Sequence, residues 1–253
     1  MAANGFEKQW DLISIEPYYL GSEPILQGIN IKQPPIKTTY IEGENFDVNG
    51  MKVVEEYHNG TEIEITDYQV IDGDNLTIDK TFITINYDKG EESFSATQAI
   101  SVEEKLQITS NKYEIQELYI SRIQPNKTIE QFKNEIATTV GEVSIYNKQN
   151  EIQKDTDIIS TGMTVEIKSQ NQQKTFLLIT QGDVNGDGKS DLKDILAINK
   201  HRLNKSNLLD EYLIAGDVNK DDSVNLKDIL LINKFRLGKI DELFKDTQNI
   251  VTE

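Results

Sequence analysis

The chain of 253 residues contains no cysteine. This excludes a disulfide framework, a thiolate zinc site and a cysteine nucleophile. Histidine is scarce, with only His58 and His201, which argues against a multi-histidine metal centre. No run of about 18 apolar residues occurs, so we expect no membrane partner. Residues 1–10 lack the basic-then-apolar pattern of a signal peptide, and we interpret residues 1–23 as a leader or the end of a preceding module.

Basic residues are outnumbered: 26 Lys and Arg stand against 43 Asp and Glu, for a net charge of −17. Nucleic-acid binding requires a basic patch, so we expect no nucleic-acid partner. Residues 182–245 differ from the rest, because they hold 12 acidic and 11 basic residues and are nearly neutral. The acidic residues of this segment are nevertheless strongly clustered.

Catalytic motifs are also missing. The sequence shows no Gly-x-Ser-x-Gly motif, no phosphate-binding glycine loop and no dinucleotide fingerprint. His58 precedes an Asn-Gly turn and is predicted to be exposed, and His201 is predicted to serve packing. We therefore predict no catalytic residue and no enzyme activity in this chain, although a longer protein could carry a catalytic domain upstream.

Residues 24–105 are rich in predicted strands. Polar and apolar residues alternate at 61–66, 82–87 and 94–102, as in strands with one buried face. Asn59-Gly60 is a strong hairpin-turn signal between two such runs. Several short strands separated by regular turns predict a β-sandwich.

The same segment resembles a bacterial immunoglobulin-like (Ig-like) module. The resemblance rests on residues 37–47 (KTTYIEGENFD), Gly50-Met51, Tyr57 with Asn59-Gly60, and Asp67-Tyr68. It implies a fold more than a function, because such modules serve as spacers, adhesins and occasional sugar binders. Glycan contact by this module therefore stays open.

Residues 113–181 predict a small α+β module. Thr128 and Gln131 form a capping-box pattern, and Ile129, Phe132, Ile136 and Val140 share one helical face. Alternating runs at 143–146, 163–167 and 176–179 predict strands after this helix. The segment is similar to modules that precede the C-terminal module of clostridial surface proteins.

An internal repeat with a period of 34 residues is the clearest feature of the chain. Residues 183–203 read DVNGDGKSDLKDILAINKHRL and residues 217–237 read DVNKDDSVNLKDILLINKFRL, with 14 of 21 positions identical. Each copy is an acidic loop that leads directly into an amphipathic helix.

The loops carry oxygen donors at the spacing of an EF-hand calcium loop, positions 1, 3, 5, 7, 9 and 12. The expected ligands of two Ca²⁺ ions are Asp183, Asn185, Asp187, Lys189 (through its backbone carbonyl), Asp191 and Asp194, then Asp217, Asn219, Asp221, Ser223, Asn225 and Asp228. Position 6 is Gly188 in the first loop and Asp222 in the second, and Asp tolerates the left-handed backbone needed there. The second loop has three ligand carboxylates against four, so we predict weaker calcium binding there.

The duplicated motif Leu-Lys-Asp-Ile-Leu-x-Ile-Asn-Lys-x-Arg-Leu, with no helix before the first loop and Asp at position 12, resembles a dockerin over residues 182–245. The resemblance implies an all-α module with two EF-hand-like calcium loops, and a cohesin domain as partner. It also implies a secreted or cell-surface, cellulosome-like setting. The fold class of the whole chain is thus multidomain: an Ig-like β-sandwich, a small α+β module and a dockerin.

In dockerins, loop positions 10 and 11 and the middle of each helix face the cohesin. Carried over, the predicted partner-binding residues are Leu192, Lys193, Asn199, Lys200, Leu226, Lys227, Asn233 and Lys234. Residue types match between the copies, so the module is predicted to dock in either of two orientations. Two alternatives stay open: the lysines could form a solvated face with no binding function, and the leucines could belong to the core.

Two other functions remain as alternatives to docking. The chain could be a structural or adhesive stalk, possibly carbohydrate-binding, whose calcium loops only stiffen it. A calcium sensor is disfavoured because each sensor EF-hand has a second flanking helix.

Overall fold

A computed structural model describes residues 24–243. The predicted leader 1–23 and Phe244, at the C-terminal end of the repeat module, lie outside the described residues. The chain divides after Glu103 into two compact units, which are described separately.

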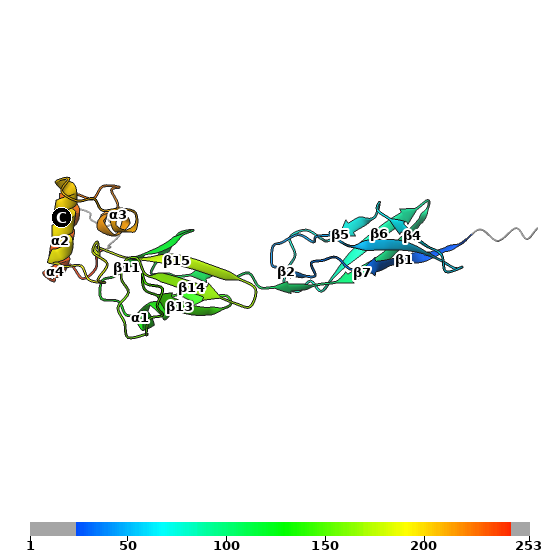
Figure 1. Cartoon of the computed structure of the whole chain (residues 1–253), viewed down its shortest axis with the longest axis horizontal. Coiled ribbons are helices and arrows are strands. Elements are labelled where there is room, and N and C mark those ends of the chain that lie inside the picture. Colours follow the sequence, from blue (N-terminus) through cyan, green and yellow to red (C-terminus); the bar gives the residue numbers. More distant parts are fainter. Residues whose placement is uncertain (1–23, 244–253) are drawn as a thin grey trace, which may run out of the picture. The chain divides into compact units, whose positions relative to one another are not determined.

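The first unit is a β-sandwich of two three-stranded antiparallel sheets (Figure 1). One has the order β1-β3-β4, with β1 Leu26–Gln33, β3 Lys52–Tyr57 and β4 Glu62–Ile65. The other has the order β5-β6-β7, with β5 Gln69–Ile71, β6 Phe82–Lys89 and β7 Glu92–Ala99. β2 (Thr39–Ile41) pairs in parallel with β8 (Ser101–Glu103). Val53 of one sheet and Ile83 and Ile85 of the other are fully buried in the shared core.

The alternation in the sequence explains these strands. Asn59-Gly60 forms the predicted turn between β3 and β4, and Gly60 has a φ of 81°, where a residue without Cβ is favoured. His58 is exposed as predicted, and its Nδ1 accepts a hydrogen bond from the Ile25 N–H at 2.9 Å. The single alternating run at 94–102 is divided between β7 and β8.

The second unit contains a five-stranded mixed sheet of order β10-β11-β15-β14-β13. Its strands are β10 Glu114–Ile115, β11 Tyr119–Ile123, β13 Glu142–Tyr146, β14 Thr164–Lys168 and β15 Gln173–Thr180. β11 and β15 run parallel, and the other neighbours run antiparallel.

Helix α1 (Ile129–Lys133) has the predicted capping box: the Thr128 side chain accepts a hydrogen bond from the Gln131 N–H, and the Gln131 side chain accepts one from the Thr128 N–H. The prediction that this helix continues to Val140 is wrong, because α1 ends at Lys133. Strand β12 (Ala137–Thr138) pairs instead with β9 (Ile108–Thr109), because the β-branched run that begins at Thr138 favours an extended backbone. Ile136 and Val140 still pack against the core that buries Ile129 and Phe132.

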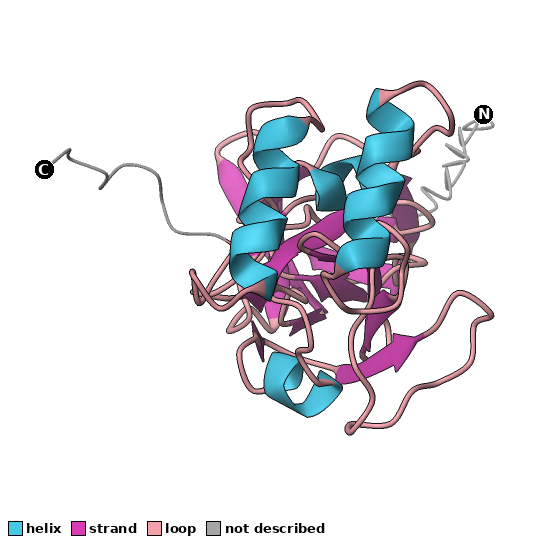
Figure 2. Cartoon of the chain, turned by 90° about the vertical axis from the view of Figure 1, so that its left-hand side faces the viewer, coloured by secondary structure: helices cyan, strands magenta, loops and turns pink. Residues whose placement is uncertain are grey.

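Three helices complete the second unit: α2 Leu192–Arg202, α3 Glu211–Gly216 and α4 Leu226–Arg236. Figure 2 shows the two long helices, α2 and α4, side by side. Ile198 and Ile232 are fully buried between them, while Ile195 and Ile229 are partly buried.

The helices share their core with the sheet. Ile179 of β15 and Tyr119 of β11 pack into the same apolar cluster as Ile198 and Ile232. Leu243 is buried in the same cluster, and its N–H donates to Oε1 of Gln124 at 3.2 Å. The module boundaries at 105, 113, 181 and 245 remain predictions.

Candidate calcium loops and docking face

The two acidic loops adopt the same backbone conformation. Loop 1, residues 183–194, connects β15 to α2, and loop 2, residues 217–228, connects α3 to α4. At loop positions 4 and 6 the backbone is left-handed in both: φ is 77° at Gly186 and 78° at Gly188, and 56° at Lys220 and 61° at Asp222. The prediction that Asp222 accepts this conformation is confirmed.

In loop 1 the carboxylate of Asp183 organises the turn. Its Oδ1 accepts hydrogen bonds from the N–H groups of Gly186 at 2.7 Å and Asp187 at 2.9 Å. Its Oδ2 accepts from Gly188 at 3.0 Å and from Thr161 at 2.8 Å. The side chain is fully buried, so the loop is wrapped around position 1.

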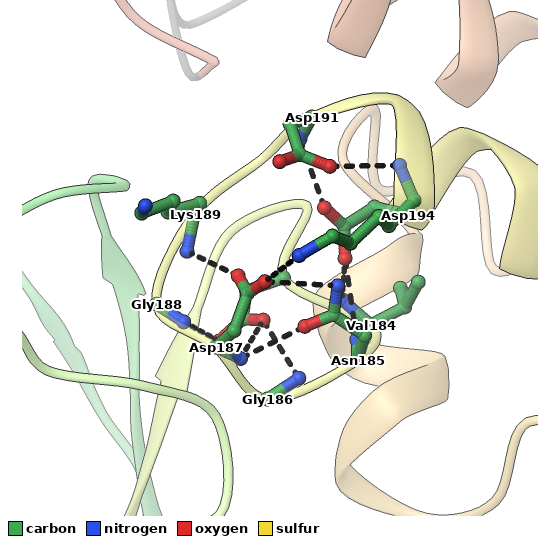
Figure 3. A network of polar contacts seen from close by, with 10 residues as sticks. Val184, Asn185, Gly186, Asp187, Gly188, Lys189, Asp191 and Asp194 are labelled. Atoms are coloured by element: carbon green, nitrogen blue, oxygen red, sulfur yellow. Dashed lines mark hydrogen bonds and ion pairs between the residues drawn. The ribbon is translucent and has the colours of Figure 1, made fainter.

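Positions 9 and 12 of each loop also begin the following helix. Asp191 caps α2 by accepting from the Lys193 N–H at 2.7 Å, and Oδ2 of Asp194 accepts from the Asp191 N–H at 2.8 Å. Oδ1 of Asp194 accepts from the N–H groups of Val184 and Asn185 at 3.0 and 3.2 Å. The carboxylate of position 12 therefore lies against both ends of the loop (Figure 3).

Loop 2 repeats this arrangement with fewer bonds. Asp217 accepts from Asp221 at 3.1 Å and from Asp222 at 2.9 Å. Asn225 caps α4, and Asp228 accepts from the N–H groups of Asn225 and Asn219 at 2.7 and 3.3 Å. Six of its twelve residues are exposed and two, Val218 and Asp228, are buried, whereas five of the twelve residues of loop 1 are buried.

Across residues 24–243, no group of three or more His, Cys, Asp or Glu side chains converges as a ready-made metal site. The position-5 carboxylates pair with lysines instead: Asp187 Oδ2 lies 3.4 Å from Lys193 Nζ, and Asp221 Oδ2 lies 2.8 Å from Lys227 Nζ. The spacing of oxygen-bearing residues in the sequence therefore identifies the two loops as candidate calcium loops. In the structure, however, the Asp187 and Asp221 carboxylates contact lysines and do not converge with the other candidate ligands.

The buried carboxylates nevertheless fit a bound cation. Asp183, Asp194 and Asp228 are fully buried, and no cationic side chain of the described chain pairs with any of them. A buried carboxylate without a counter-charge is unfavourable, and hard divalent cations such as Ca²⁺ prefer carboxylate and carbonyl oxygens. The donor set therefore suits calcium.

Without a metal these groups resist ionisation. Burial raises the pKa of Asp194 to about 7, and the nearby charges of Asp183 and Asp187 act in the same direction. Burial likewise raises the pKa of Asp183 and of Asp228. In contrast, the hydrogen bond from Lys227 lowers the pKa of the exposed Asp221 carboxyl.

The predicted docking residues lie mainly on an exposed face of α2 and α4. Leu192 is 59% exposed and Leu226 is 58% exposed, so neither leucine belongs to the core. The lysines at 193, 200, 227 and 234 are exposed as well. Asn199 and Asn233 are half-buried, and each accepts a hydrogen bond from an arginine on its own helix, Arg202 or Arg236.

Four further leucines on this face were not predicted. Leu196 and Leu203 of the first copy, and Leu230 and Leu237 of the second, are each more than half exposed. The signal was present in the sequence, because Leu196 follows Leu192 by one helical turn and Leu230 matches it in the repeat. We call the six leucines and the four lysines of this surface the helix face.

These features define the chain as a modular protein with a two-loop acidic module at its C-terminal side. Residues 181–236 match the family model of the Dockerin type I domain, and residues 33–120 match that of the Bacterial Ig-like domain (group 3). The chain thus carries a type I dockerin domain preceded by a bacterial Ig-like domain. The Ig-like match extends beyond Glu103 into β11.

Other comparisons add little. No curated protein matches the chain. Among solved structures, it is similar to the anomalous substructure of Titin-A168169, with 14% identity and a TM-score of 0.26, over 60% of this chain and 98% of that chain. The I-band fragment I67-I69 from titin gives 11% identity and a TM-score of 0.28, over 62% and 67%. Scores this low support no argument about this chain.

The dockerin match has direct consequences for the loops. Type I dockerin domains bind calcium through duplicated EF-hand-like loops, so calcium is the cofactor of this module. They are cohesin-binding docking modules, and both domain types are non-catalytic and typical of secreted or cell-surface proteins. Among the described helices, none has the length and apolar character needed to cross a membrane.

Proposed function

We propose that this chain docks to a cohesin domain in a calcium-dependent manner and anchors the protein that carries it in an extracellular complex. The Ig-like module, residues 24–105, serves as a stalk. The α+β module (113–181) and the dockerin (182–245) form one unit. The observation that carries the proposal is the helix face, which presents the same leucines and lysines from both repeat copies.

Two Ca²⁺ ions hold the dockerin in its binding-competent form. The proposed ligands of the first are Asp183, Asn185, Asp187, the carbonyl of Lys189, Asp191 and Asp194. Those of the second are Asp217, Asn219, Asp221, Ser223, Asn225 and Asp228. Ligation requires Asp187 and Asp221 to exchange their lysine partners for calcium, which frees Lys193 and Lys227 for the cohesin. Calcium would in this way link loop structure to the charge of the helix face.

The partner is expected to present carboxylates around an apolar patch. Exposed lysines would set the association rate and partner choice, and the leucines would supply most of the affinity. Because Leu192 and Leu226 are equally exposed and occupy the same repeat position, the dockerin could bind in two orientations related by a half turn.

Leucine truncations in one and in both copies test this proposal. Leu192→Ala alone and Leu226→Ala alone should each leave cohesin affinity within a few fold, because the other orientation remains available. The double variant should weaken binding by roughly tenfold or more. Leu118→Ala is the matched control, since Leu118 is 74% exposed but lies outside the helix face. Loss of binding in one single variant would contradict two orientations, and an unaffected double variant would remove the helix face from the interface.

A further inference from the structure

We propose that the α+β module completes the first calcium site. The backbone N–H of Thr161 holds the Asp183 carboxylate in its ligand orientation, so Thr161 is a positioning residue of calcium site 1. Calcium site 2 has no such support. The proposal concerns calcium binding alone and does not depend on the cohesin interaction.

The contact joins residues 22 positions apart in the sequence. The Thr161 N–H donates to Asp183 Oδ2 at 2.8 Å, and both residues are fully buried. Thr161 is itself fixed to β15, since its hydroxyl donates to the Thr180 carbonyl at 3.1 Å and accepts from the Thr180 N–H at 3.2 Å. The donor is therefore held rigidly by the sheet and not by the calcium loop.

The turn of loop 1 also fits closely against the module. A Cβ added to Gly188 would lie 2.7 Å from Cγ2 of Ile158 and 2.8 Å from the carbonyl oxygen of Ile159. The carbonyl oxygen of Gly188 accepts a hydrogen bond from the Asn126 N–H at 2.9 Å. Position 6 of loop 1 thus lies between two segments of the α+β module, which restricts the loop to one conformation.

Loop 2 provides an internal reference within the same chain. Among the described residues, the Asp217 carboxylate accepts hydrogen bonds only from Asp221 and Asp222 of its own loop. Loop 2 does contact the sheet, through an ion pair between Lys220 and Glu114, but Lys220 occupies position 4 and is not a predicted ligand. The position-1 carboxylate is therefore supported from outside the loop in site 1 only.

Support of this kind has a known effect on metal affinity. Groups that hydrogen-bond a ligand fix its orientation before the ion arrives, and their loss typically lowers metal affinity about 10- to 100-fold. We infer that the α+β module orients the Asp183 carboxylate before the ion binds, and that site 1 therefore fills at a lower calcium concentration than site 2.

Replacement of the Thr161 amide by an ester in the full chain tests the proposal, because it removes the N–H and leaves the side chain intact. Calcium titration is followed by nuclear magnetic resonance at the amides of Gly188 for site 1 and Asp222 for site 2. The expected result is about a tenfold weaker site 1 with site 2 unchanged. An ester at Met163 is the matched control, since its N–H bonds the Ser160 carbonyl in the same turn and not Asp183. Equal weakening of both sites, or an unchanged site 1, would overturn the proposal.

If the chain with the ester at Thr161 does not fold, a second measurement uses the chain with its natural backbone. In the variant Asp217→Ala only site 1 can fill normally. The Thr161 amide resonance should then move with calcium at the same midpoint as the Gly188 amide. A Thr161 resonance that is insensitive to calcium while Gly188 titrates would show that the N–H plays no part in site 1.

Discussion

Single carboxylates in both loops serve two structural roles at once. Asp194 and Asp228 complete a capping box at the start of a helix and also bind backbone N–H groups at the beginning of the loop. A side chain of this length reaches both partners while it stays buried. Asp in place of the longer Glu at position 12 is consistent with this tight closure.

The titration of these carboxylates predicts opposite pH dependences with and without calcium. The pKa of Asp194 is raised to about 7 by burial, above an unfolded value of about 3.9. Between these values the calcium-free folded state binds more protons than the unfolded state, so its stability falls as pH rises through this window. Calcium displaces the proton, so its affinity should fall about tenfold per pH unit below about 7 for each proton released.

Thermal unfolding of the chain at pH 5.5 and pH 8 measures this difference. In chelator the second unit should be more stable at pH 5.5, and in calcium it should be more stable at pH 8. The same pH trend in both conditions would contradict the assigned role of the buried carboxylates.

The two calcium sites are expected to differ in affinity. Loop 1 offers four of the proposed ligand carboxylates and has five buried residues, whereas loop 2 offers three and has two buried residues. Calorimetric titration with calcium should therefore resolve two steps, and Asp183→Ala should remove the tighter one. The counterpart Asp217→Ala should remove the weaker step. A single step of two equivalent ions would contradict this prediction.

At the scale of elements, α2 and α4 divide their surfaces between core and helix face. Ile198 and Ile232 are fully buried, while Leu196 and Leu230, two positions earlier on the same helices, are more than half exposed. Exposed leucines at matching positions contribute little to folding, which suggests a role in binding.

The double variant Leu196→Ala with Leu230→Ala tests that role. We expect cohesin affinity to fall roughly tenfold, because two apolar anchors are lost, while the melting temperature stays within about 2 °C. Ile198→Ala is the contrasting variant and should destabilise the module by about 2–5 kcal/mol through a core cavity. A large loss of stability in the leucine variant would assign these side chains to folding instead.

The sequence predicts elements where local patterns carry the information. The capping box at Thr128, the Asn59-Gly60 turn and the left-handed Asp222 all depend on near neighbours and were predicted correctly. The helix end at Lys133 was missed because pairing with β9 overrides the helical pattern. α3 was not predicted, since six residues are too few to show a helical period.

The support of loop 1 by Thr161 lies beyond sequence reasoning for a different reason. The donor is a backbone N–H, which every residue except proline carries, so the residue type gives no signal. Its position depends on the pairing of β14 with β15 and on the turn before β14, which only the folded sheet defines.

In the whole molecule, the two compact units have separate cores, and both calcium loops lie in the second. Calcium should therefore raise the melting temperature of the second unit and leave that of the Ig-like unit unchanged. Differential scanning calorimetry in calcium and in chelator should show one transition that moves and one that does not. Two transitions that shift together would indicate coupling between the units.

Calorimetric titration of the chain against a panel of cohesins, in calcium and in chelator, measures whether this dockerin docks. We expect tight one-to-one binding to at least one cohesin in calcium and loss of that binding in chelator. Calcium binding with no affinity for any cohesin of the panel would contradict it, and would favour a structural stalk whose loops only stiffen the module.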